Sequence, residues 1–299
     1  MTGGRRQATV LFMRLITDPG ELASLGPCVF VPTMGALHDG HAALIRIGVA
    51  EAERRGLSGG CVVSIFVNPT QFNDFADFEK YPRTMDADLL ACEGSGASAV
   101  FAPSVEAVYP PGEAASEVVL PPVATAPGLE DRFRPGHFEG VYRVVRRLFE
   151  LVKPVAAVFG EKDWQQLRVI SAMVEREGLG VEIVPGETVR EAGGLAMSSR
   201  NKHLGPEDRE AALSLSRALC AAGREGDPAE AERVMEAMMR EAGAEPEYAV
   251  VRDAETLLSI GAGHAGPARA LVAARVGTTR LLDNAPWPSV GFGVGAAAL

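Results

Sequence analysis

Apolar runs of strand length alternate with longer segments of helical spacing through the first 180 or so residues. The predicted strands are 28–31, 61–67, 97–102, 155–159 and 181–184, and the predicted helices are 41–55, 84–93, 137–152 and 164–177. Strands that alternate with helices in this way predict an α/β domain, in which helices cover both faces of a parallel sheet. The proline-rich stretch 109–136 interrupts the pattern and is expected to be extended around one short strand, 117–120.

The pattern changes after Pro185. Two predicted helices, each opened by a proline, come first, and three strand-like runs follow. They occupy 206–222 and 228–242, then 248–252, 268–275 and 279–283, with a possible short strand at 188–190. Helices followed by strands predict a smaller α+β unit that covers the ligand-binding edge of the first. We expect a boundary near 186, with domains 1–186 and 187–299, and a loose tail from about Pro286.

Polar side chains follow three of the predicted strands, at the point where each strand ends. Ligands of parallel sheets bind outside the carboxyl ends of the strands, so we expect these side chains to meet at one edge. The pairs are His38 and His41, Asn68 and Gln71, and Lys162 and Asp163.

His38 and His41 lie where a helix is predicted to open directly after a strand. A helix N-terminus offers free N–H groups and the positive end of the helix dipole, which favour phosphate. Two imidazole donors there suit a polyphosphate whose charge shifts during a reaction. Zinc is the alternative ligand, but the sequence offers no clear third ligand beside this His-x-x-His pair.

The remaining candidates depend on position. Lys162 after a glycine turn suits phosphate, although a solvated lysine is the commoner situation. Ser198-Ser199-Arg200 offers donors to phosphate oxygens, but from these residues alone a polar interdomain loop is the simpler interpretation. Asp163 is predicted to cap the next helix. Gln71 and Gln166 are suited to the hydroxyl and carboxylate groups of a polar substrate.

The composition narrows the class of protein. The chain has 299 residues, of which 47% are hydrophobic and 23% charged, as in ordinary globular proteins. Its net charge of −10 argues against a nucleic-acid partner. The four cysteines are scattered without a Cys-x-x-Cys pair, which favours a reducing cytoplasm. We expect no signal peptide and no membrane helix.

Six segments, spread from about Leu15 to Asn284, resemble the pantothenate synthetase (pantoate–β-alanine ligase) family in the family's order. His-x-Gly-His alone is shared across a wide nucleotidyltransferase superfamily, which includes class I aminoacyl-tRNA synthetases, but Asn-Pro-x-Gln-Phe and Lys-Asp-x-Gln-Gln are far more particular. The segments are Pro32-Thr33-Met34-Gly35-Ala36-Leu37-His38-Asp39-Gly40-His41, Asn68-Pro69-Thr70-Gln71-Phe72, Tyr81-Pro82-Arg83-Thr84, Arg134-Pro135-Gly136-His137-Phe138, Phe159-Gly160-Glu161-Lys162-Asp163-Trp164-Gln165-Gln166-Leu167 and Gly194-Leu195-Ala196-Met197-Ser198-Ser199-Arg200-Asn201.

The resemblance implies a Rossmann-like domain with a smaller C-terminal lid domain, usually as a homodimer. It also implies a two-step reaction. ATP and pantoate give pantoyl adenylate and pyrophosphate, and β-alanine then displaces AMP to give pantothenate. The expected partners are therefore these small molecules, with no nucleic acid and no membrane.

The same resemblance assigns residues. Gln71 and Gln166 hold pantoate, Gln71 also meets β-alanine, and His41 is the residue usually marked catalytic. His38, Lys162 and Arg200 are suited to stabilise the charge that moves onto pyrophosphate. We expect Mg²⁺ to be held largely by the triphosphate, with no protein metal site. The residues expected to bind ATP are Met34, Gly35, Ala36, Leu37, His38, Asp39, Gly40, His41, Gly160, Glu161, Lys162, Asp163, Val189, Met197, Ser198, Ser199 and Arg200.

The chain departs from the family pattern at two positions: Asp131 stands where glycine is common, and Trp164 replaces a smaller aromatic residue. Two alternative functions stay open from the sequence. One is another adenylyltransferase of the same superfamily with a different acceptor. The other is a nucleotide-binding regulatory module without turnover.

Overall fold

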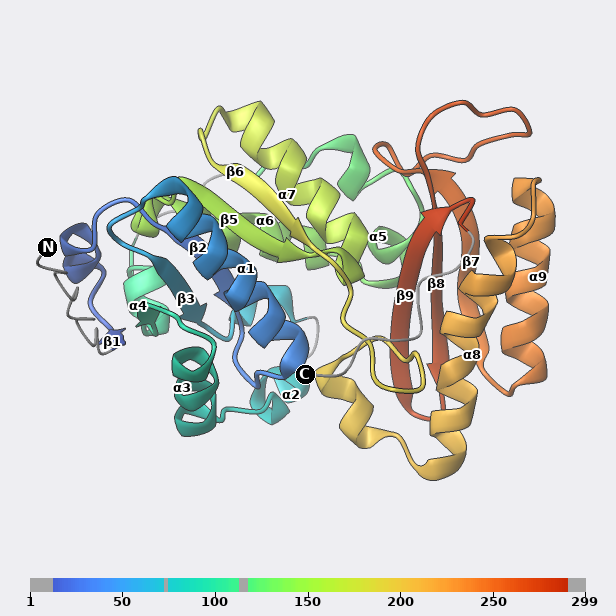
Figure 1. Ribbon diagram of the computed structural model, residues 1–299, viewed down its shortest axis with the longest axis horizontal. Coiled ribbons are helices and arrows are strands. Elements are labelled where there is room, and N and C mark those ends of the chain that lie inside the picture. Colours follow the sequence, from blue (N-terminus) through green and yellow to red (C-terminus); the bar gives the residue numbers. More distant parts are fainter. Residues whose placement is uncertain (1–12, 73–74, 113–117, 290–299) are drawn as a thin grey trace, which may run out of the picture.

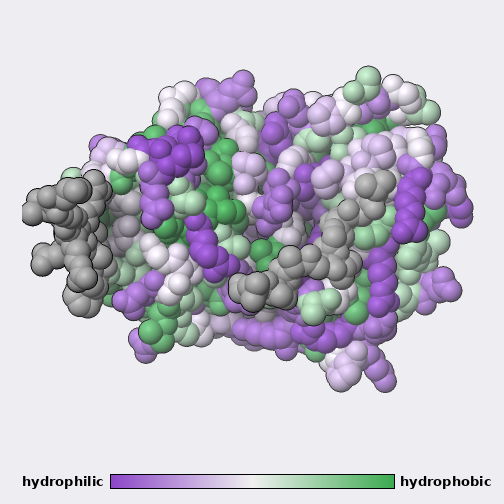
Figure 2. Space-filling view, in the orientation of Figure 1, coloured by the Kyte–Doolittle hydropathy of each residue, from purple (hydrophilic) through white to green (hydrophobic). Residues whose placement is uncertain are grey.

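A computed structural model of the chain describes residues 13–72, 75–112 and 118–289. In it, a six-stranded parallel sheet lies beside a three-stranded antiparallel sheet (Figure 1). No helix in these residues is long and apolar enough to cross a membrane. Hydrophilic residues run along the outward faces of helices α1 (Asp39–Arg55) and α8 (Pro206–Ala222) (Figure 2).

The parallel sheet has the strand order β1-β4-β3-β2-β5-β6. From β2 the chain builds outward to β3 and β4, and it then returns to add β5 and β6 on the other side of β2. The strand order therefore reverses between β2 and β5, where the loops that follow the two strands separate and leave room for a ligand. The strands are β1 (Arg14–Ile16), β2 (Val29–Thr33), β3 (Cys61–Ile65), β4 (Ala99–Phe101), β5 (Ala156–Gly160) and β6 (Glu182–Gly186).

Helices cover both faces of this sheet, as the near-continuous apolar strands require. Phe30 of β2 packs in the cluster that α6 and α7 complete, whereas its neighbours Val29 and Val31 pack on the opposite face with Ile45 of α1. The helices are α1 (Asp39–Arg55), α2 (Phe75–Lys80), α3 (Met85–Gly94), α4 (Val105–Val108), α5 (Glu130–Phe133), α6 (His137–Val152) and α7 (Trp164–Glu177), with short 3-10 helices at η1 (Pro19–Ser24), η2 (Pro69–Gln71), η3 (Pro122–Ala124) and η4 (Glu161–Asp163).

The second sheet is antiparallel, in the order β7-β8-β9, and helices α8 and α9 pack on one of its faces. Its own core includes Leu215, Met235 and Val272. The elements are η5 (Ser199–His203), α8 (Pro206–Ala222), α9 (Pro228–Glu241), β7 (Glu245–Asp253), β8 (Ala268–Val276) and β9 (Thr279–Trp287). The predicted fold class, a helix-covered parallel sheet with a smaller α+β unit, is confirmed. The domain boundary at 186 stays a prediction.

Several local predictions were wrong. The pattern missed β1, a three-residue strand too short to show periodicity. Residues 118–120 form no strand, and Glu117 lies outside the described residues. The expected strand 188–190 is only a single bridge from Arg190 to Ala196. Pro286 does not begin a loose tail, because β9 continues through Trp287 paired with β8. The remainder of the predicted tail, 290–299, lies outside the described residues.

Candidate active site

A cavity of about 1030 Å³ lies at the carboxyl ends of β2, β3 and β5 and extends to β9. It is therefore at the strand-order reversal, and the three polar pairs expected from the sequence all contribute to its lining. Such a volume is at the upper end of small-molecule sites. Of the predicted site residues, those that line it are Met34, His38, Gly40, His41, Gln71, Gly160, Lys162, Asp163, Gln166, Val189, Met197, Ser198, Ser199 and Arg200.

The start of α1 fixes the protonation of both histidines. His38 is the N-cap, and its Nδ1 accepts the N–H of Gly40 at 3.2 Å, while Nδ1 of His41 accepts the N–H of His38 at 3.3 Å. A neutral imidazole whose Nδ1 accepts a hydrogen bond carries its proton on Nε2. Each ring therefore has Nε2–H left to donate to a ligand. The ring centroids are 4.1 Å apart, so the two donors act on one small region.

The same surroundings keep both rings neutral. Burial lowers the pKa of His41 to about 3, with His38 and Lys162 acting in the same direction. Burial and then Lys162 also lower the pKa of His38. Neutral donors near a cation stabilise negative charge without taking up a proton, so these histidines are suited to binding phosphate oxygens rather than to acid–base chemistry near pH 7.

A buried carboxylate that the sequence analysis did not single out supports the loop before His38. Asp88 of α3 is 2% exposed and accepts the backbone N–H groups of Ala36 at 3.0 Å and Leu37 at 2.8 Å. Gly35 has φ +77, and a Cβ there would lie 2.9 Å from Asp88 Oδ2. The loop can therefore turn this tightly only with glycine at 35.

Gln71 is held from two sides. Its Oε1 accepts from Asn68 Nδ2 at 3.1 Å, and its Nε2 lies 2.9 Å from the sulfur of Met34. Its backbone carbonyl accepts from Nδ1 of His137 at 3.5 Å. Helix α6 comes very close here, because a Cβ on Gly140 would lie 2.7 Å from the Gln71 Cα. These contacts fix the position of Gln71, whereas Gln166 lines the cavity from the first turn of α7.

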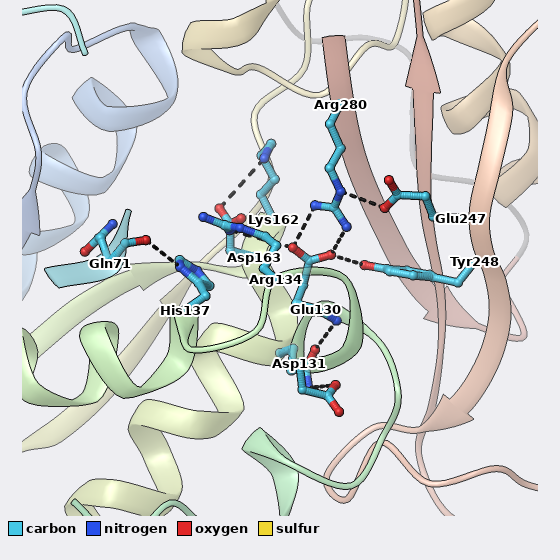
Figure 3. Close-up of polar contacts among 11 residues, drawn as sticks. Gln71, Glu130, Asp131, Arg134, His137, Lys162, Asp163, Glu247, Tyr248 and Arg280 are labelled. Carbon is cyan, nitrogen blue, oxygen red and sulfur yellow. Dashed lines mark hydrogen bonds and ion pairs between the residues drawn. The ribbon is translucent and has the colours of Figure 1, made fainter. Parts of the chain in front are cut away.

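Charged residues continue along the cavity from η4 toward the second sheet (Figure 3). Lys162 Nζ lies 3.8 Å from Asp163 Oδ2. Burial raises the pKa of Asp163, but Lys162, Arg200 and Arg134 together bring it below its ordinary value. Asp163 was predicted to cap α7, and that was wrong for its side chain, which makes no capping hydrogen bond. Its carboxylate instead offsets part of the positive charge.

Glu130 joins this group to the second sheet. Its carboxylate receives two hydrogen bonds from Arg280 of β9, at 2.8 and 2.6 Å, and one from the Tyr248 hydroxyl at 2.9 Å (Figure 3). Arg134 lies 3.7 Å from the same carboxylate. Arg134 also lines the cavity, so it adds a cation to this side of the site.

The segment between the two sheets closes the cavity as a small hairpin. The Met197 N–H donates to the Val189 carbonyl at 2.9 Å, and Arg190 forms a bidentate pair with the buried carboxylate of Asp283 in β9. The hairpin leads into η5, where Ser198 accepts the N–H of Arg200 at 3.3 Å. Val189, Met197 and Arg200 therefore face the same cavity as the histidines.

Five predicted ATP-binding residues do not line the cavity: Gly35, Ala36, Leu37, Asp39 and Glu161. Glu161 instead pairs with Arg269 at 2.8 Å. The described residues contain no group of three or more His, Cys, Asp or Glu that could hold a metal ion. The sequence therefore did not distinguish the residues that line the cavity from those that support it, because both kinds belong to the same short motifs.

The family model for pantoate-beta-alanine ligase matches residues 16–286, which is most of the chain. The chain belongs to the pantoate-beta-alanine ligase family. A pantothenate synthetase of Nocardioides sp. is 51% identical over 261 residues, or 86% of this chain and 77% of the relative. A crystal structure of the pantothenate synthetase of Thermus thermophilus superposes with a TM-score of 0.83 at 43% identity, covering 91% of this chain and 99% of that one.

A family member from Francisella tularensis was crystallised as a pantoate-beta-alanine ligase complexed with "Beta-gamma ATP" and β-alanine. It is 30% identical, with a TM-score of 0.73, and covers 93% of this chain and 100% of the other. Family members that are 43% and 30% identical to this chain therefore both share its fold.

The two departures from the family pattern have structural roles. The Asp131 carboxylate accepts the N–H groups of Gly128 at 3.0 Å and Leu129 at 2.8 Å, and the side chain of Gln165 at 3.0 Å. It thereby tightens the turn before α5. The Trp164 indole donates to the Ala254 carbonyl at 2.9 Å, which ties α7 to the end of β7. Neither Asp131 nor Trp164 lines the cavity itself.

Proposed function

We propose that this chain condenses pantoate with β-alanine to pantothenate, using ATP and passing through a pantoyl adenylate. The observation that carries the proposal is one cavity whose lining joins the two Nε2–H donors of His38 and His41, the cations Lys162 and Arg200, and the amides of Gln71 and Gln166. The first two groups suit a triphosphate, and the amides suit the hydroxyl and carboxylate groups of pantoate.

In the first step a pantoate carboxylate oxygen attacks the α-phosphorus of ATP, and the bond to pyrophosphate breaks. The carboxylate is already ionised near pH 7, so no general base is needed. The step requires alignment, which we assign to Gln71 and Gln166, and stabilisation of charge on the leaving group. We assign that stabilisation to His41, His38, Lys162 and Arg200.

In the second step the neutral amine of β-alanine attacks the adenylate carbonyl, AMP leaves and the amine loses a proton. The adenylate must survive until the amine arrives, so water has to be kept out. We assign this to the hairpin and η5, which carry Val189, Met197, Ser198 and Ser199 at the cavity. In this proposal the C-terminal unit acts as a lid, and Gln71 contacts β-alanine as well as pantoate.

Mg²⁺ is proposed to enter as part of the substrate, bound to the triphosphate oxygens. The described residues fit this proposal, because they offer cations and neutral donors around the cavity and no carboxylate cage. We further propose a homodimer in the cytoplasm, where the four free cysteines stay reduced.

The test is a pyrophosphate-release assay with ATP, Mg²⁺ and pantoate, with and without β-alanine. We expect one enzyme equivalent of pyrophosphate without β-alanine and sustained release with it. Release that needs a different acceptor would identify another adenylyltransferase of the superfamily. ATP binding without any release would favour a regulatory module, and either result would refute the proposal.

A further inference from the structure

Asn284 of β9 lies against η4, the turn that carries Lys162. It is 3% exposed, and its side-chain Nδ2 donates to two backbone carbonyls, that of Glu161 at 3.0 Å and that of Lys162 at 2.7 Å. Its Oδ1 accepts from Nε of Arg269. Both hydrogens and the oxygen of this amide are therefore used, and the two hydrogens hold consecutive peptides of η4.

Arg269 of β8 completes the contact. Its guanidinium lies 3.6 Å from the centre of the Trp164 ring and donates to the Glu161 carboxylate at 2.8 Å. Arg269 is 6% exposed, so this stack is closed to solvent. The second sheet therefore holds η4 at the Glu161 side chain, at two of its carbonyls and at the residue that follows it.

From this geometry we propose that Asn284 is a positioning residue for Lys162. The inference rests on the proposed function, because it assigns to Lys162 the leaving-group charge of the first step. Fixing the Lys162 carbonyl fixes the direction in which the side chain leaves the backbone. A lysine side chain has many rotamers, so an anchored base reduces the volume that its ammonium group explores.

Lys162 and the residue that anchors it belong to different parts of the fold. Lys162 follows β5 of the parallel sheet, but the amide that fixes it comes from a strand 122 residues later. Lys162 is therefore correctly placed to bind phosphate only when β8 and β9 pack against η4. The second sheet contributes to the first step of the reaction as well as covering the cavity.

A double-mutant cycle with Asn284→Asp and Lys162→Ala tests this role. Asn284→Asp keeps the size of the side chain and the acceptor for Arg269, but it replaces the amide donor with an oxygen that repels the two carbonyls. If Asn284 acts through Lys162, the substitution lowers single-turnover pyrophosphate release about 30-fold in the wild-type background, and less than about threefold once Lys162 is alanine. An equal loss in both backgrounds would mean a general structural role and would overturn the proposal.

The affinity for MgATP, measured by calorimetry on the same four proteins, gives a second cycle that does not depend on pantoate. If the wild type binds MgATP without pantoate-dependent release, the proposed function fails, while this second cycle still decides the role of Asn284. A wild type that does not bind MgATP would overturn both. Ser214→Ala is the control, since Ser214 is 3% exposed in α8 and bonds only within its helix, to Ala211. Asn284→Ala repeats the cycle without a repulsive oxygen if Asn284→Asp does not fold.

Discussion

The ion pair between Glu130 and Arg280 links the second sheet to the rest of the protein, and replacing Arg280 should lower the stability of the fold by a predictable amount. Arg280→Met keeps the apolar stem but removes the guanidinium that donates to Glu130 at 2.8 and 2.6 Å. The Glu130 side chain is 9% exposed, so its carboxylate would stay buried with the Tyr248 hydroxyl and with Arg134 at 3.7 Å. Breaking a buried pair by removing one partner costs about 3–5 kcal/mol, and we expect the lower end because these two partners remain.

At roughly 2 °C per kcal/mol for a chain of this size, a loss of about 3 kcal/mol lowers the midpoint of thermal unfolding by about 6 °C. Circular dichroism on heating measures this midpoint. The matched control is Arg217→Met, which removes an exposed pair with Glu210 at 2.5 Å and should change the midpoint little. The double variant Glu130→Gln with Arg280→Met should recover part of the loss, because the Glu130 charge is removed together with its main partner. Both variants also take the 2.7 Å bond of Arg280 from Glu247, which keeps Arg275 at 3.3 Å.

The pH dependence follows from the pKa of Glu130. Burial raises this pKa, but Arg280, Arg134 and the Tyr248 hydroxyl together hold it below its ordinary value. A carboxylate whose folded pKa is depressed stabilises the fold above its unfolded pKa and loses that contribution as the pH falls through the folded value. The unfolded states of the two proteins are alike, so the difference in stability between wild type and Arg280→Met depends on the pKa of Glu130 in each folded state. Without Arg280, burial should raise that pKa. The difference should therefore be largest at neutral pH and above, and shrink as the pH falls through the two folded pKa values. A midpoint for Arg280→Met equal to that of Arg217→Met, or a double variant no better than the single one, would refute this reasoning.

Three further predictions concern the reaction. His41→Ala should lower the rate of pantoate-dependent pyrophosphate release by about 100-fold or more, because it removes an Nε2–H donor to the phosphates. Its circular dichroism spectrum should be unchanged. Normal turnover or an unfolded variant would count against this prediction. The rate of release without β-alanine should show no inflection from His38 or His41 between about pH 6 and 8, since both pKa values are lowered, that of His41 to about 3. An inflection in that range that disappears in His41→Ala would contradict the conclusion that these rings stay neutral. Gly140→Ala should raise the KM for pantoate about tenfold with little change for ATP. The new Cβ would lie 2.7 Å from the Gln71 Cα and closer still to the Thr70 carbonyl oxygen, so it would displace the backbone that carries Gln71. Gly94→Ala, where a Cβ meets nothing within 4 Å, is its control, and equal effects of the two on pantoate would refute the role.

The sequence by itself determined the long elements and many of the residues that line the cavity. Helices 137–152 and 164–177 are found at the predicted residues, because their apolar periodicity and their Pro or Gly ends are local properties. The polar pairs after three strands were expected to meet, and they do, since the carboxyl ends of parallel strands share one edge. Short motifs also predicted the family, which the comparisons confirm.

Only the tertiary structure decided which residues support that edge. Asp88, Glu130 and Asn284 each hold site residues or the loops next to them from another part of the chain, at separations of 51, 150 and 122 residues for the bonds to Leu37, Arg280 and Lys162. No local pattern marks such a residue, because a buried carboxylate or amide looks in sequence like any surface polar residue until its partners are known. The short β1 and the last residues of β9 were missed for a related reason: their stability comes from pairing with β4 and β8 rather than from their own periodicity.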